Sequence, residues 1–214
     1  MYGIFMTSPI EFQKDATKKC VFCQPSLELI LKQTEHFTLM LDPFALVPGH
    51  LLLTSREHYG CLGELPEELQ EEAIRLRNDA CEQLYQAFKE PITRYEHGRA
   101  GHCLLRDSST RSCHHYHEHL IPKHIPLHAQ LSVHFKYLTY QSNADLCALY
   151  ERYNEYLLVV EPGMENRFYI AKDKLVEPHL LRTLSAKAIG FPERANWENY
   201  TSCTLMLEGK QILQ

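Results

Sequence analysis

The segment of residues 115–122, His-Tyr-His-Glu-His-Leu-Ile-Pro, constrains this chain more than any other part of its sequence. Its alternation and closing proline predict a β-strand, and successive side chains of a strand point to opposite faces of a sheet. His115, His117 and His119 would then share one face, about 6.6 Å apart at each step. Three imidazoles on one face can bind a metal, or can attack and clamp a phosphate, because a neutral imidazole is nucleophilic near neutral pH. The alternative is a surface strand that carries histidines by chance.

The histidines are concentrated around this segment, since nine of the 13 lie between His97 and His134. The 214 residues, 44% of them hydrophobic, suffice for one large domain or for a domain with an extension. With 22 basic and 27 acidic residues the net charge is −5, which argues against a nucleic-acid partner. No run approaches the roughly 20 apolar residues of a membrane span, and the first residues do not resemble a signal peptide. We therefore expect a cytoplasmic protein with reduced thiols and no membrane partner.

Periodicity and turn residues predict an α+β fold with an antiparallel sheet. Pro66, Glu67 and Glu68 are typical of the first turn of a helix, because proline fits there and acids favour the positive end of the helix dipole. The predicted strands cover residues 37–41, 50–54, 92–96, 115–121, 156–160 and 167–171, and the predicted helices cover 65–88, 144–153 and 178–189.

The histidine segment resembles the His-φ-His-φ-His-φ-φ signature, in which φ is apolar, of the histidine-triad (HIT) superfamily of nucleotide hydrolases and transferases. Residues 42–53, Asp-Pro-Phe-Ala-Leu-Val-Pro-Gly-His-Leu-Leu-Leu, are similar to the strand-turn-strand of that family. Residues 55–58, Ser-Arg-Glu-His, are similar to its basic stretch ending in histidine, and Cys20-Val21-Phe22-Cys23 to the Cys-x-x-Cys of its zinc-containing members. The tail is similar to the extension of certain longer bacterial members.

This resemblance implies a HIT-like fold: a five-stranded antiparallel sheet with one long helix, followed by a C-terminal hairpin and helix. It places the HIT domain at residues 20–135 and a C-terminal extension, packed on the same domain, at residues 136–214. The family commonly dimerises by joining two sheets, which leaves a homodimer open for this chain.

The resemblance also implies catalytic roles. His117 matches the histidine that attacks the α-phosphate of a nucleotide to form a covalent nucleotidyl-imidazole. His119 and His50 match positions that contact phosphate oxygens in the transition state. Ser112, three residues before His115, matches a hydroxyl that helps the leaving group.

For nucleotide binding, Asp42 matches the acid that binds the ribose hydroxyls, and Leu41 and Phe37 are expected to line the base pocket. Two features depart from the family pattern. Glu118 takes a φ position, and it must be paired or exposed because an unpaired buried carboxylate is costly. The usual glycine-containing pair ahead of Ser112 is missing, and Arg111 stands there as a candidate for binding a further phosphate.

The pair Cys20 and Cys23 predicts little alone, because a zinc site needs two more ligands. In zinc-containing HIT proteins two histidines complete the set, at positions that match His58 and His115. The resemblance thus implies a closed Cys2His2 zinc site with a structural role, since four protein ligands leave no position for a catalytic water. The alternative is two unbound thiols.

We expect a nucleotide hydrolase that acts on a phosphoanhydride or phosphoramidate: a dinucleoside polyphosphate, an adenosine phosphoramidate or a nucleotide sugar. The first alternative is a nucleotidyltransferase or phosphorylase with phosphate or sugar phosphate as the acceptor. Basic residues of the tail, Arg182 among them, are suggestive of such an acceptor. The second alternative is a nucleotide-binding or zinc-binding module without turnover.

Overall fold

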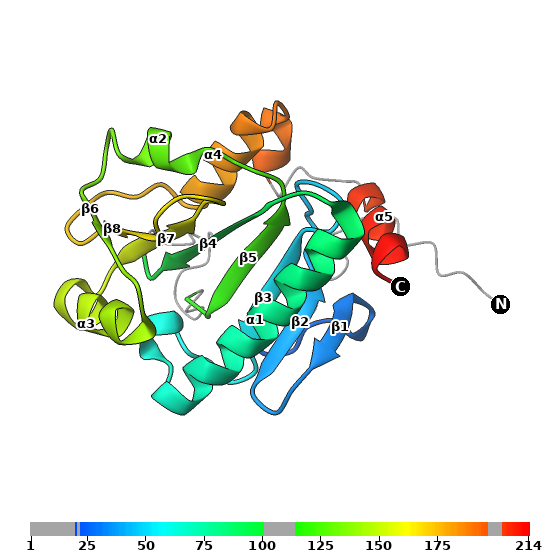
Figure 1. The fold of residues 1–214 in the computed structure, drawn as a ribbon, viewed down its shortest axis with the longest axis horizontal. Coiled ribbons are helices and arrows are strands. Elements are labelled where there is room, and N and C mark those ends of the chain that lie inside the picture. The colour runs from blue at the N-terminus through cyan, green and yellow to red at the C-terminus, as the bar shows by residue number, and fades with distance from the viewer. Residues whose placement is uncertain (1–19, 21, 101–113, 197–202) are drawn as a thin grey trace.

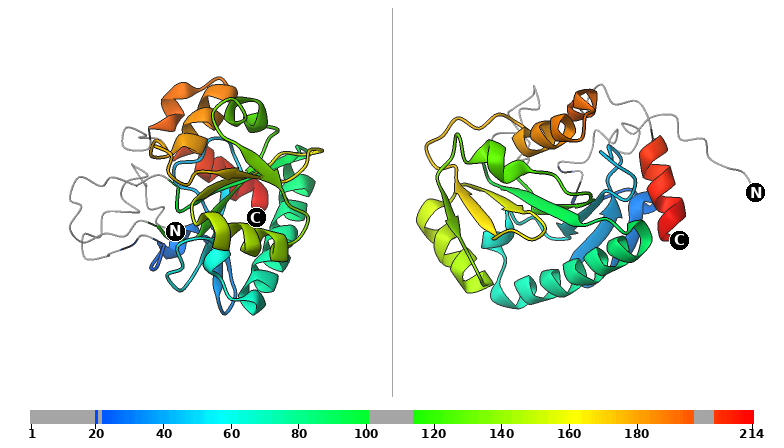
Figure 2. Two further views of the ribbon diagram at one scale, coloured as in Figure 1. Left: turned by 90° about the vertical axis from the view of Figure 1, so that its left-hand side faces the viewer. Right: turned by 45° about the horizontal axis from the view of Figure 1, so that its top comes forward.

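The computed structural model describes residues 20, 22–100, 114–196 and 203–214. The fold is α+β, with helices on both sides of one antiparallel sheet (Figures 1 and 2). The strands are β1 (Ile30–Gln33), β2 (Phe37–Leu41), β3 (Leu51–Ser55), β4 (Ile92–Gly98), β5 (His117–Pro122), β6 (Tyr137–Thr139), β7 (Tyr156–Val160) and β8 (Arg167–Ile170); the α-helices are α1 (Glu67–Phe88), α2 (Leu127–Leu131), α3 (Asn143–Tyr153), α4 (Leu180–Ala188) and α5 (Thr204–Leu213).

The sheet has eight strands in the order β1-β2-β3-β5-β4-β7-β8-β6, so the expected count of five is wrong. The first five strands of this order, β1-β2-β3-β5-β4, lie side by side and come from residues 30–122. The outer edge of β4 would leave backbone N–H and C=O groups unpaired, and β7 pairs with it from Arg94↔Val160 to Gly98↔Tyr156. The hairpin of the extension therefore continues the sheet, and β1 and β6 form its edges.

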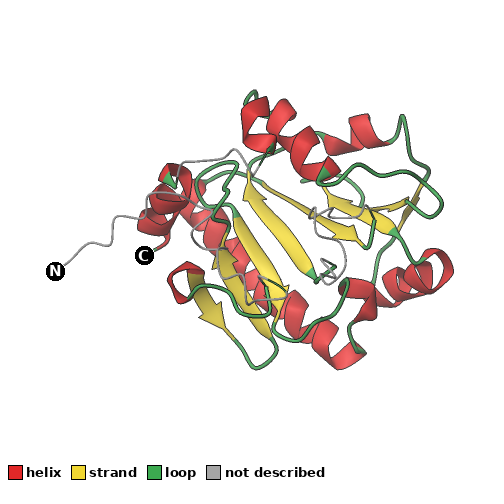
Figure 3. Ribbon diagram, turned by 180° about the vertical axis from the view of Figure 1, so that it is seen from behind, coloured by secondary structure: helices red, strands yellow, loops and turns green. Residues whose placement is uncertain are grey.

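Helix α1 covers one face of the sheet, and α2 and α4 lie on the opposite side (Figure 2). Figure 3 shows the sheet from the face that α1 leaves open. The helix begins after Pro66 and ends where Lys89 takes a left-handed conformation. The predicted helices are present with ends shifted by up to two residues, whereas α2 and α5 were not predicted. Within the described part of the chain, no helix is long and apolar enough to span a membrane.

Glu118 is paired, as its position required. Its side chain is 1% exposed on the α1 side of the sheet. Its carboxylate contacts Arg94 Nη1 at 2.7 Å and Arg77 Nη1 at 3.5 Å, and the two guanidinium groups replace the lost hydration.

We predict that Arg94→Met lowers the free energy of unfolding by about 2 kcal/mol, because a buried carboxylate loses its shorter charged hydrogen bond. Urea unfolding monitored by circular dichroism measures the change. Arg75→Met is the matched control, since Arg75 pairs with Glu71 at 3.6 Å and both side chains are 69% exposed. The control should stay within about 0.5 kcal/mol of the parent. Equal losses in the two variants would contradict the prediction.

A second buried acid, Glu96, lies on the same side of the sheet. It accepts hydrogen bonds from Leu62 N at 2.8 Å and Tyr156 Oη at 3.1 Å, and it has no cation within ion-pair distance among the described residues. Burial raises its pKa from 4.5 to about 8. Between these values the folded state keeps a proton that the unfolded state has lost, so the free energy of unfolding falls as pH rises.

Glu96→Gln should therefore flatten the pH dependence of stability between about pH 5 and about pH 8. The parent slope due to this group is at most about 1.36 kcal/mol per pH unit. Urea unfolding across this pH range measures it, with exposed Glu151→Gln as the control. An unchanged slope in Glu96→Gln would show that Glu96 is already ionised in the folded protein.

Candidate active site and metal cluster

Strand register determines which side chains share the face with the histidines. His117 on β5 pairs with Thr54 on β3, and His119 pairs with Leu52 on β3 and with Tyr95 on β4. Because directly paired residues point to the same face, these five side chains lie together on the face opposite α1. Tyr95 stacks on His119 with ring centroids 4.4 Å apart.

The same register separates the expected base-pocket residues from the histidines. Leu41 pairs with Leu51, which pairs with Leu120, so Leu41 points to the α1 side. Phe37 is fully buried on that side, where it meets Tyr116 edge-on. The residue next to Leu41, Met40, does face the histidines, because it pairs with Leu52, which pairs with His119. One residue of offset along β2 accounts for the difference, because side chains alternate between faces.

His117 presents one ring nitrogen to the site. Its Nδ1 lies 2.7 Å from the His115 carbonyl oxygen, so Nδ1 carries the proton and donates it. This hydrogen bond leaves the Nε2 lone pair available for attack. Burial lowers the pKa of His117, which keeps the ring neutral near pH 7. Phe22 stacks on this ring at 4.6 Å.

His50 lies behind His119 and orients it. The Leu46 N–H donates to His50 Nδ1 at 3.1 Å, which places the His50 proton on Nε2. That Nε2 donates to His119 Nδ1 at 2.9 Å, so His119 carries its own proton on Nε2. Burial lowers the pKa of His50 to about 4 and that of His119 well below its ordinary value. His50 is 1% exposed, and the contact of its Nε2 is with His119.

Asp42, the expected ribose ligand, is engaged within the protein. It is 3% exposed, and its Oδ1 accepts the Phe44 N–H at 2.8 Å. Its Oδ2 lies 3.4 Å from Arg182 Nη1 and 3.4 Å from His50 Nδ1. Arg182 comes from α4 in the extension, and the sequence suggested it only as one of several basic tail residues.

The four expected metal ligands converge. Cys20, Cys23, His58 and His115 each place one ligand atom within 4.8 Å of the others. The measured separations are 3.2 Å between the two Nδ1 atoms, 3.4 Å from Cys20 Sγ to His115 Nδ1, and 3.3 Å from Cys23 Sγ to His58 Nδ1. A tetrahedral ion with bonds of about 2.05 Å to nitrogen and about 2.3 Å to sulfur requires edges of about 3.3 Å and about 3.6 Å. The donor set therefore fits a tetrahedral cation.

The surroundings of the cluster are consistent with a cation. The His115 Nε2–H donates to the Ser55 carbonyl at 2.7 Å, which turns the Nδ1 lone pair toward the cluster. Burial and the neighbouring Cys20 raise the pKa of Cys23 to about 11. A bound cation reverses this effect, because it stabilises the thiolates.

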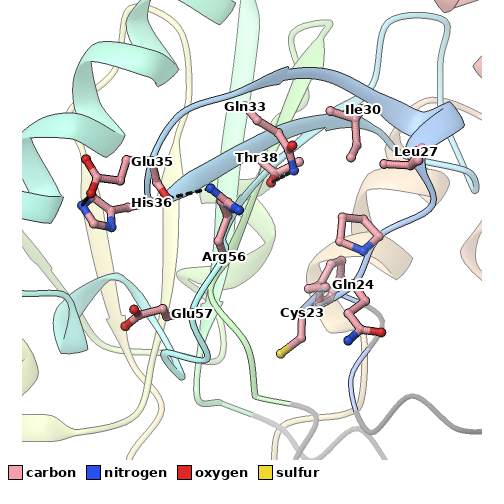
Figure 4. Close-up of a pocket in the computed structure, with 12 residues that line it drawn as sticks. Cys23, Gln24, Leu27, Ile30, Gln33, Glu35, His36, Thr38, Arg56 and Glu57 are labelled. Atoms are coloured by element: carbon pink, nitrogen blue, oxygen red, sulfur yellow. Dashed lines mark hydrogen bonds and ion pairs between the residues drawn. The ribbon is translucent and has the colours of Figure 1, made fainter.

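A hollow of about 450 Å³ adjoins the metal cluster on the histidine side of the sheet (Figure 4). Cys23 and Phe22 line it on one side, and Gln33 and Thr38 from β1 and β2 line another. Arg56 also lines the hollow, and its guanidinium donates hydrogen bonds to the backbone carbonyls of residues 34 and 35. Phe22 lines the hollow and also stacks on His117, so its ring lies between the hollow and that histidine.

Ser112 and Arg111 lie outside the described residues. The sequence analysis missed the parts of the site that come from other strands and from the extension. These are Tyr95, Met40 and the role of Arg182, together with His97, whose Nε2 accepts the Leu181 N–H at 3.2 Å. Of these four residues, only His97 could have been suspected from the sequence, because it belongs to the segment 97–134 in which histidines are concentrated.

The candidate site thus combines a strand of alternating histidines in an antiparallel sheet with a buried histidine from a neighbouring loop. Residues 26–125 match the family model described as HIT domain, which supports the HIT superfamily for this segment. No curated protein matches the chain.

Among solved structures, one similar chain is a HIT-like protein from Bartonella henselae, with 19% identity, a TM-score of 0.35 and coverage of 44% of this chain and 65% of that chain. A HIT family member from Bacillus subtilis has 21% identity, a TM-score of 0.39 and coverage of 50% and 74%. Yeast Ap4A phosphorylase in complex with Ap4A has 15% identity, a TM-score of 0.46 and coverage of 91% and 79%. Likeness this distant does not define a substrate for the present chain.

Proposed function

We propose that this protein is a nucleotide hydrolase that attacks the α-phosphate of a nucleoside phosphoanhydride or phosphoramidate through His117. One observation carries the proposal: the His117 Nδ1–H is bound to the His115 carbonyl, and its Nε2 lone pair is left for attack. His119 stands beside it, with ring centroids 5.2 Å apart. The chain of hydrogen bonds from Leu46 through His50 makes His119 Nε2 a donor to the phosphate oxygens.

The chemistry proceeds in two displacements. In the first, a bond forms between His117 Nε2 and the α-phosphorus while the bond to the leaving phosphate or amine breaks. The leaving group departs with its electron pair, and a leaving amine takes up a proton from solvent. In the second, water attacks the same phosphorus, the P–N bond breaks, and the water proton passes to solvent. A nucleoside monophosphate leaves and neutral His117 is restored. Splitting one difficult displacement into two easier ones is the advantage of the covalent route.

For the nucleoside, the register favours Met40 and Leu52 as the apolar contacts of the base, because they share the face of His119. We keep the expectation that Ser112 assists the leaving group and that Arg111 binds a further phosphate. We propose zinc as the ion of the Cys20, Cys23, His58 and His115 cluster. Zinc fits this donor set, and its role would be to tie the N-terminal segment to the sheet.

A chromatographic turnover assay tests the function. The panel contains diadenosine tri- and tetraphosphate, an adenosine phosphoramidate, ADP-ribose, and UDP- and GDP-sugars, each with and without inorganic phosphate. Release of a nucleoside monophosphate without added phosphate is the expected result. A nucleoside diphosphate formed only with phosphate would assign the protein to the phosphorylases instead. No turnover by folded, metal-loaded protein would leave a binding module.

A further inference from the structure

We propose that the C-terminal extension positions the catalytic histidines: Arg182 of α4 and Arg194 of the 3-10 helix η4 (Pro192–Ala195) fix the loop of residues 42–50 that carries Asp42 and His50. This role presupposes the proposed function of His117 and adds a positioning device to it. Figure 2 shows α4 on the side of the sheet opposite α1. The strand register places His117 and His119 on that same side.

Arg182 is the centre of this contact. It is 5% exposed, and its guanidinium donates from each of its three nitrogens. Nη1 reaches the Asp42 carboxylate at 3.4 Å, and Nε reaches the Ala195 carbonyl at 3.3 Å. Nη2 donates to the carbonyls of Phe44 and Arg194. A buried guanidinium satisfied in this way holds two residues of the loop against two residues of η4.

Arg194 forms a hydrogen bond with the same loop at a second point. Its Nη1 donates to the Leu46 carbonyl at 2.7 Å, and the N–H of Leu46 is the donor that sets the tautomer of His50. A third point lies in α5, where a side chain at Gly209 would overlap the backbone of Gly49. The loop is thus held by three elements of the extension, none of which belongs to the segment that matches the HIT model.

The charge arrangement explains why an arginine is needed. Asp42 Oδ2 lies 3.4 Å from His50 Nδ1, and alone it would draw a proton onto that nitrogen. Arg182 supplies the counter-charge, so His50 Nδ1 remains an acceptor for Leu46 N–H and the His50 proton stays on Nε2. The groups that face His50 are Asp42 and Leu46 from its own loop, His119 from β5 and Arg182 from α4.

The test is Arg182→Gln in the full chain, assayed on the substrate that the panel identifies. We expect kcat to fall about 10²-fold with KM nearly unchanged, because the misplaced relay affects the chemical step. Arg182→Lys should recover part of kcat, since it restores the charge without the fork. Arg167→Gln is the matched control: Arg167 also lies in the extension and pairs with Glu165 at 2.8 Å, away from the loop. It should keep the parent kcat.

A second readout separates positioning from mere stability. ¹⁵N NMR of the histidine rings should show His50 protonated at Nε2 in the parent, and in Arg182→Gln a shift of that proton to Nδ1, the nitrogen beside Asp42. If Arg182→Gln does not fold, Arg194→Gln replaces it, because Arg194 is only half-buried. We expect about a 10-fold lower kcat for that variant.

The proposal fails if a folded Arg182→Gln protein keeps both the parent kcat and the His50 tautomer. It also fails if only KM changes, and only for ribonucleotides and not for 2′-deoxy analogues, because Asp42 would then be a ribose ligand that Arg182 merely supports. Mass spectrometry of the parent keeps these outcomes apart from failure of the proposed function. A nucleotidyl adduct on His117 in the parent upholds that function whatever Arg182→Gln does.

Discussion

His117→Ala should abolish the nucleotidyl adduct and lower turnover by about 10⁴-fold or more, since removal of a nucleophile leaves only binding and electrostatic stabilisation. The structure leaves the Nε2 lone pair of His117 available for attack, because its Nδ1–H is bound to the His115 carbonyl at 2.7 Å. Intact-protein mass spectrometry of rapidly quenched enzyme measures the adduct, and chromatography measures turnover.

His134→Ala is the control, since His134 is exposed and lies after α2, outside the site. It should show both the adduct and parental turnover. If His117→Ala still forms an adduct of the same mass, another residue is the nucleophile. If it turns substrate over at the parental rate without any adduct, water attacks directly and the covalent route is excluded.

Removal of the proposed zinc ion should lower the melting temperature by about 8–16 °C. A ligand present at 1,000 times its dissociation constant stabilises the folded state by about 4.1 kcal/mol. In a chain of this length each 1 kcal/mol shifts the melting temperature by about 2–4 °C. Cys23→Ser and treatment with a chelator both test this, because Cys23 Sγ lies within 3.6 Å of both His58 Nδ1 and His115 Nδ1. Calorimetry measures the shift, and elemental analysis measures the zinc content.

Cys147→Ser is the matched control. Cys147 is half-buried and hydrogen-bonded to Gln70 on α1, far along the chain from the cluster, and serine can replace that bond. The control should retain one zinc and the parental melting temperature. Purified parent protein without zinc, and with a melting temperature unaffected by chelator or added zinc, would show that Cys20 and Cys23 are unbound thiols.

The local parts of the fold could be predicted from the sequence, because they depend on neighbours in the chain. The alternation of residues 115–122 predicted β5, and Pro66 with its following acids predicted the start of α1. The edges of the sheet could not be predicted in this way. Strand β6 is three residues long and exposed, so its sequence carries no burial pattern to detect.

Pairing across the sheet decided what the alternation left open. All five residues of β2 are buried, so burial does not distinguish the side chains of its two faces. The register with β3 shows that Met40, and not Leu41, faces His119. The requirement that Glu118 be paired could be derived from its chemistry alone. Its partners could not, because Arg77 lies on α1 and Arg94 on β4.

By itself the sequence indicated the residues of the candidate site: a strand of alternating histidines and four side chains that can hold a metal ion. These are properties of residue types and short spacings. The tertiary structure alone decided how that chemistry is arranged, because Arg182 and Asp42 lie 140 residues apart and meet only through packing of the extension on the sheet. The tautomers of His50 and His119 follow from that packing, since burial makes each ring neutral and its hydrogen-bond partners then fix the proton.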